Sequence, residues 1–67
     1  MKIFGEKLKE LRLAQGLTQS ELAFAIQTSK QNLSRWEKGY FEPDQETLVA
    51  IARYFGVTLD YMLGLED

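Results

Sequence analysis

The stretch from Lys30 to Lys38 holds most of the chemistry that this sequence offers. On a helical wheel of about 100° per residue, its hydrogen-bonding side chains fall within one arc that contains no acidic residue: Lys30, Gln31, Ser34, Arg35 and Lys38. Leu33 and Trp36 fall elsewhere on the wheel and predict a narrow buried edge. Arginine and lysine complement the acceptors of guanine in the major groove of DNA, and glutamine complements adenine. The arc therefore indicates a surface that reads bases, whereas an ordinary solvated helix face mixes charges of both signs.

The charges of the chain are divided unevenly along its length. The formal net charge is -2, which by itself does not favour a nucleic-acid partner. Residues 1–40, however, hold seven basic and four acidic side chains, a net of +3, while residues 41–67 hold one basic and six acidic side chains, a net of -5. This asymmetry favours a molecule that approaches a polyanion with one side, the alternative being a chance division of solvated charges.

The composition excludes most catalytic chemistry. With no cysteine and no histidine, the chain has no zinc-ligand set, no thiol nucleophile and no Ser-His pair. The ten carboxylates fall mostly at predicted helix caps and turns, and the glycines do not have a phosphate-loop spacing. We therefore expect no enzyme activity, no metal and no cofactor. No apolar run approaches the roughly 18 residues of a membrane span, and the first residues do not form a signal peptide, so a cytoplasmic protein is expected.

Helical periodicity runs through nearly the whole chain and predicts an all-α fold. A chain of 67 residues has room for one hydrophobic core, so residues 1–67 are expected to form a single domain. The pattern predicts five helices, over residues 3–15, 19–26, 29–38, 45–56 and, after a cap at Thr58, a short one ending at Gly64.

Local signals mark the ends of these helices. Thr18 and Glu21 have the spacing of a capping box, Leu17 and Leu22 that of a hydrophobic staple, and Ser29 is the expected N-cap of the third helix. Each glycine is predicted to lie near a helix end, where a left-handed residue is easiest without a Cβ atom: Gly5, Gly16, Gly39, Gly56 and Gly64.

Apolar side chains recur at helical spacing in the first and fourth helices, and these stripes are expected to face the core. The members of the two stripes are Phe4, Leu8 and Leu11, and Leu48, Ile51, Ala52 and Phe55.

Residues 19–39 resemble the helix-turn-helix of the lambdoid phage repressor and Cro group, also called the XRE family. The resemblance extends over most of the chain, through Thr-Gln at 18–19, Leu-Ala at 22–23, Arg-Trp-Glu-Lys-Gly at 35–39 and Phe-Gly-Val-Thr-Leu-Asp-Tyr at 55–61. It implies a lambda-repressor-like fold and a sequence-specific DNA-binding transcription regulator, a repressor whose helix 29–38 enters the major groove of an operator.

The sequence departs from the family pattern in two places. Gln27 occupies the turn position where the family has glycine, and Thr28 occupies a small aliphatic position, so the turn is expected to cost some stability. The loop at 39–43, which is often basic in relatives, is aromatic and acidic here.

The resemblance assigns roles to individual residues. It implies that Lys30, Gln31 and Arg35 read bases, with Ser34 close enough for a further contact, and that the phosphate contacts come from Gln19, Ser29 and Lys38. It also implies that Arg12 and Glu37 form a structural ion pair that reads no bases.

The expected partners are a double-stranded DNA operator and a second copy of the chain. The apolar residues of the last helix are the candidates for a homodimer interface: Leu59, Met62, Leu63 and Leu65. The alternative is a protein-interaction or antitoxin-like module of the same fold, which would use the acidic second half and the exposed aromatic residues Tyr40, Phe41, Tyr54 and Tyr61.

Overall fold

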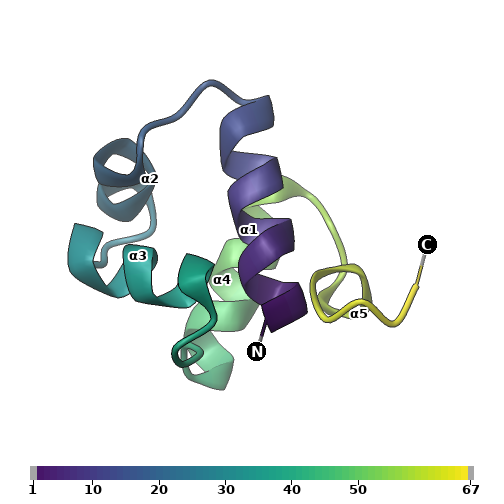
Figure 1. Cartoon of the computed structure of the whole chain (residues 1–67). Coiled ribbons are helices and arrows are strands. Elements are labelled where there is room, and N and C mark those ends of the chain that lie inside the picture. Colours follow the sequence, from purple (N-terminus) through teal and green to yellow (C-terminus); the bar gives the residue numbers. More distant parts are fainter. Residues whose placement is uncertain (1, 67) are drawn as a thin grey trace.

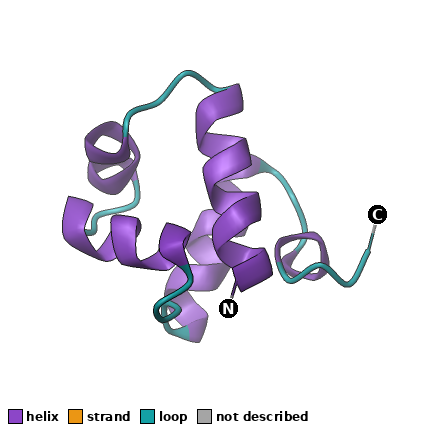
Figure 2. Cartoon of the chain, in the orientation of Figure 1, coloured by secondary structure: helices purple, strands orange, loops and turns teal. Residues whose placement is uncertain are grey.

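Helices account for most of the chain in the computed structural model, which describes residues 2–66 (Figures 1 and 2). In chain order they are α1 (Lys2–Ala14), α2 (Gln19–Ala25), α3 (Lys30–Lys38), α4 (Gln45–Phe55) and α5 (Leu59–Met62). The described residues contain no strand, which confirms the predicted all-α class and five-helix order. Where an observed end differs from the predicted one, the difference is one or two residues. At Ile26, Ser29 and Gly56 the reason is that the capping residue itself is not helical, while α1 begins and ends one residue earlier than predicted.

The helix α1 stands at the centre of the molecule (Figure 1). In that view α2 and α3 lie on one side of α1, α5 lies on the other side, and α4 lies behind. The helix α3 packs against both α1 and α2, and α5 packs against both α1 and α4. The predicted helix-turn-helix, α2 and α3, therefore lies across α1 from the C-terminal helix.

The core draws on every helix. Its buried hydrophobic members are Phe4, Leu8, Leu22, Ala23, Leu33, Trp36, Ile51, Ala52 and Met62. The predicted stripes are confirmed at these positions, and the remaining stripe residues, Leu11, Leu48 and Phe55, are half-buried against the same cluster. Leu33 and Trp36 place the buried edge of α3 where the helical wheel predicts it.

Side-chain caps begin four of the helices. The Thr18 hydroxyl accepts a hydrogen bond from the Glu21 amide at 3.0 Å, and the Glu21 carboxylate accepts one from the Thr18 amide at 2.8 Å, so the predicted capping box is confirmed. Ser29 and Thr58 cap α3 and α5 as predicted. Asp44 caps α4, and hydrogen bonds from Thr47 hold the pKa of the Asp44 carboxyl below its usual range.

Left-handed residues end the helices. Gly16, Gly39, Gly56 and Gly64 all have positive φ, as predicted. The end of α2 uses Gln27 instead, at φ 61°. There the Thr28 amide donates to the Ala23 carbonyl at 2.8 Å and the Gln27 amide donates to the Phe24 carbonyl at 3.2 Å, the two bonds of a Schellman motif. The turn therefore forms without glycine, at the cost of placing a Cβ atom in the left-handed region.

The prediction for Gly5 is wrong. Gly5 lies inside α1, is buried and does not have a positive φ. A Cβ atom at this position would overlap the Trp36 carbonyl oxygen and would lie 2.7 Å from the Glu37 carbonyl oxygen. Gly5 is therefore the point at which α1 and the last turn of α3 approach each other through their backbones.

Candidate nucleic-acid interface

The outer face of α3 borders a shallow groove of about 450 Å³. Its lining residues are Gln19, Lys30, Gln31, Ser34, Arg35, Lys38 and Tyr40. The groove thus brings together all four predicted base-reading residues and two of the three predicted phosphate-binding residues, Gln19 and Lys38. Ser29 is exposed but does not line the groove, because it lies at the N-cap, where its hydroxyl accepts from the Asn32 amide at 3.0 Å.

The side chains of the groove are available to a ligand. Lys30, Gln31, Arg35 and Lys38 are exposed, and Ser34 is half-buried. The lining contains three cationic side chains and no carboxylate. A groove of this composition attracts an anion and offers both donors and acceptors to a base edge.

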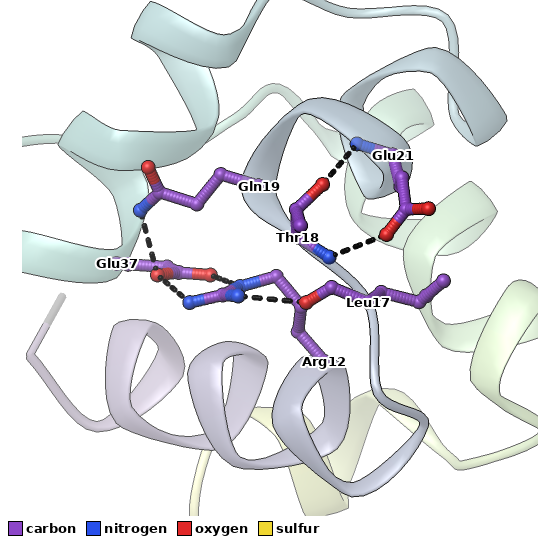
Figure 3. Close-up of polar contacts among 6 residues, drawn as sticks. All are labelled: Arg12, Leu17, Thr18, Gln19, Glu21 and Glu37. Carbon is purple, nitrogen blue, oxygen red and sulfur yellow. Dashed lines mark hydrogen bonds and ion pairs between the residues drawn. The ribbon is translucent and has the colours of Figure 1, made fainter.

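Beneath α3, a buried polar network connects three helices (Figure 3). Arg12 Nε donates to Glu37 Oε2 at 2.6 Å and Arg12 Nη2 donates to Glu37 Oε1 at 3.1 Å, a paired contact with side-chain exposures of 9% and 4%. Arg12 Nη1 also donates to the Leu17 carbonyl at 2.8 Å, just before α2 begins. The network therefore ties the end of α3 to α1 and to the entry of α2.

Gln19 joins the same network from the first turn of α2. Its Nε2 donates to Glu37 Oε1 at 3.0 Å (Figure 3). The sequence alone did not predict this contact. A side-chain amide nitrogen carries two hydrogens, so Gln19 keeps one donor for an incoming oxygen while Glu37 fixes its position.

Two aromatic side chains after α3 lie beside its basic residues. The Arg35 guanidinium carbon lies 5.6 Å from the ring centre of Phe41, and Lys38 Nζ lies 5.9 Å from that of Tyr40. Both rings were predicted, under the alternative of a protein-interaction module, to belong to a protein-binding surface. Tyr40 lines the groove and Phe41 does not. The position of the two rings directly after the glycine that ends α3 is the signal that could have placed them beside the basic residues of that helix.

At the opposite side of α1, the structure excludes one of the four residues predicted for a dimer interface. Met62 is fully buried in the core of its own domain, so its side chain is not available to a second copy. Leu59 and Leu63 are half-buried, and Leu65 is 72% exposed. Ile3, half-exposed, lies against Gly64 and belongs to the same apolar end of the molecule, which was not predicted. The periodicity of so short a helix could not tell which side chain faces inward.

Five helices with a capped two-helix unit and an acid-free basic groove define the class of small helix-turn-helix domains. The family described as helix-turn-helix matches residues 8–62, and the chain belongs to this family. Among residues 2–66, no helix has both the length and the apolar character to cross a membrane.

The similar proteins are transcription regulators. The chain is 41% identical over 64 residues to the HTH-type transcriptional activator BcrR of Enterococcus faecalis, covering 96% of this chain and 31% of BcrR. It is 38% identical over 63 residues to the HTH-type transcriptional regulator ImmR of Bacillus subtilis, covering 94% of this chain and 50% of ImmR. The chain thus spans only 31% of the length of BcrR and 50% of the length of ImmR.

A solved structure extends the likeness to the complete fold. The P22 c2 repressor protein, crystallised in complex with the synthetic operator 9T in the presence of Tl+, matches with a TM-score of 0.89 at 26% identity, over 98% of this chain and 100% of that chain. This confirms the resemblance to the lambdoid repressors and the lambda-repressor-like fold.

Proposed function

We propose that this chain is the operator-binding domain of a transcription repressor, which inserts α3 into the major groove of double-stranded DNA. The observation that carries the proposal is the groove on α3. Three cations and two groups that complement base edges or phosphates, Gln19 and Gln31, converge there without a carboxylate, on a helix that the Arg12–Glu37 network connects to α1 and α2. The likeness to a repressor bound to its operator supports this orientation.

In this proposal Lys30, Gln31 and Arg35 read base edges and Ser34 makes a further contact. Gln19, Ser29 and Lys38 hold phosphates. Gln19 lies in the first turn of α2 beside the Thr18–Glu21 capping box, and only the amide groups that this box leaves uncapped are available to help it hold an anion. Phosphate contacts position the helix, and base contacts provide the sequence preference.

Selection of bound sequences from a random DNA pool tests the proposal directly. The wild-type chain should select one sequence, and Gln31→Ala or Arg35→Ala should each cost about 1–3 kcal/mol and relax the preference at one position. Equal weakening on all sequences by these two variants would contradict the base-reading role. Gln19→Ala is the matched control, since loss of a phosphate contact should weaken specific and random DNA alike.

The salt dependence of binding separates this function from a protein-interaction module. Neutralisation of phosphates releases counterions, so the affinity for DNA should fall steeply as the salt concentration rises. A chain that bound no DNA at low salt would belong to the protein-interaction class instead.

We also propose that the chain acts as a homodimer on its operator, in the cytoplasm of a bacterium or as a phage-encoded protein. One reading helix with three base-reading side chains distinguishes only a few base pairs, and two-fold pairing doubles the contacts. The exposed part of the apolar end, Leu65 with Ile3 and the half-buried Leu59 and Leu63, supports the pairing of two copies.

A further inference from the structure

The loop after α3 turns back over the helix that it follows. Gly39 adopts φ 79°, and the Tyr40 amide then donates to the Arg35 carbonyl at 3.1 Å. At the other end of the loop, Pro43 is buried and Asp44 caps α4. The backbone of this short loop is therefore held at both ends.

The aromatic side chains of this loop lie beside two basic residues in the last turns of α3. The Phe41 ring lies 5.6 Å from the guanidinium carbon of Arg35. A guanidinium is planar and weakly hydrated, so it lies well against an aromatic face while its N–H edge stays free to donate. An exposed arginine otherwise samples many rotamers, and binding must order it at an entropic cost.

We propose that Phe41 is a positioning residue for Arg35, so that a side chain of the loop sets how strongly the chain prefers the base pair that Arg35 reads. This inference rests on the proposed DNA-reading function. The ring restricts the guanidinium before DNA arrives, which raises the affinity for the correct base edge and leaves little freedom to turn toward a phosphate or a wrong base. Phe41 is 48% exposed and belongs neither to the core cluster nor to the residues packed against it, so its removal can be tested apart from the core.

The neighbouring pair supplies the matched control. Tyr40 lies 5.9 Å from Lys38 Nζ, is 72% exposed and lines the same groove. Lysine carries a compact point charge that suits a phosphate without regard to sequence. Loss of the Tyr40 ring should therefore change affinity equally on all sequences.

The test uses Phe41→Leu, which keeps an apolar side chain but removes the ring. Selection from a random DNA pool should show a loss of about two- to fivefold in preference at the same base pair that Arg35→Ala relaxes. The Phe41→Tyr variant keeps the ring and should retain the wild-type preference. Tyr40→Leu should leave every base preference unchanged, and circular dichroism should report the same thermal midpoint for Phe41→Leu and wild type.

A double variant separates positioning from indirect effects. In an Arg35→Ala background, Phe41→Leu should change the base preference no further, because the group that Phe41 positions is gone. If Arg35→Ala relaxes one base pair while Phe41→Leu changes none, the positioning role is wrong and the proposed DNA-reading function stands. If the wild-type chain selects no sequence at all, the proposed function fails and the role of Phe41 fails with it.

Discussion

The contact between Arg12 and Glu37 illustrates how a buried charge pair acts at the scale of single residues. Both side chains are almost fully removed from solvent, and their bonds to each other, to the Leu17 carbonyl and to Gln19 replace the lost hydration. Such a pair adds little stability compared with apolar residues of the same shape, but removal of one partner leaves an uncompensated charge in the interior. The expected role of the pair is therefore to hold the last turn of α3 in one orientation.

This role predicts the effect of removing either partner. Glu37→Ala and Arg12→Ala should each lower the free energy of unfolding by about 3–5 kcal/mol. The double variant should lose clearly less than the sum of the two, since the second removal takes away a charge that is already unpaired. Urea unfolding of the wild type, the two single variants and the double variant measures this double-mutant cycle. Additive losses of stability would show that the two side chains do not stabilise each other.

The backbone of Gln27 gives a second prediction at this scale. Its left-handed conformation is strained for a residue with a Cβ atom, so Gln27→Gly should raise the free energy of unfolding by roughly 0.5–1 kcal/mol after the greater freedom of glycine in the unfolded chain is included.

The reverse exchange at Gly16 provides the control. A Cβ atom at Gly16 would meet nothing within 4 Å, so Gly16→Ala changes only the backbone preference at φ 70° and should lower the thermal midpoint. A lower midpoint for Gln27→Gly would mean that the glutamine side chain contributes more than its backbone costs.

At the scale of elements, the crossing of α1 and α3 decides where the reading helix lies. The carbonyl groups of Trp36 and Glu37 approach Gly5 so closely that no side chain fits between the two helices. Glu37 also forms an ion pair with Arg12 of α1. The last turn of α3 is therefore held against α1 both by backbone packing and by this ion pair.

The variant Gly5→Ala tests this close approach, because the expected change in stability is opposite to that in an ordinary helix. In an ordinary helix interior this substitution raises stability by up to about 1 kcal/mol. Here we expect a loss of about 1–3 kcal/mol, because the added methyl group must push α3 away from α1. Thermal unfolding measures the loss, and a more stable Gly5→Ala variant would contradict the close approach of the helices.

At the scale of the whole molecule, the proposed reading face and the proposed pairing face lie on different sides of α1 (Figure 1). The substitution Leu65→Glu tests the pairing face, because Leu65 is 72% exposed and a charge there costs the monomer little. It should preserve the helix content while weakening self-association and operator affinity together. Sedimentation velocity and circular dichroism on the same samples measure both.

Met62→Glu is the matched control for this prediction. Met62 is fully buried, so an introduced carboxylate should unfold the domain instead of only separating two copies. If Leu65→Glu associates and binds DNA like the wild type, the pairing surface lies elsewhere on the molecule.

The sequence alone was sufficient to predict the features that depend on nearby residues. The capping box at Thr18, the N-cap at Ser29 and the glycines that end α3 and α4 each act within one helical turn, so residue type and spacing decide them. Periodicity similarly predicted the inward side of α3, because Leu33 and Trp36 lie on one stripe whatever packs against it.

Only the tertiary structure decided the contacts between helices distant in sequence. A glycine near the start of a helix suggests a helix end, which is what the sequence predicted for Gly5. Its actual role is to let α3 approach, and the sequence of α1 alone does not determine where α3 packs. Met62 and Leu65 are similar in character, and only the placement of α5 against α1 and α4 buries one and exposes the other. The bond from Gln19 to Glu37 and the ring of Phe41 beside Arg35 likewise depend on distances across the fold. The physical reason is that local backbone preferences act over a few residues, whereas close packing couples side chains that the chain brings together only when the core forms.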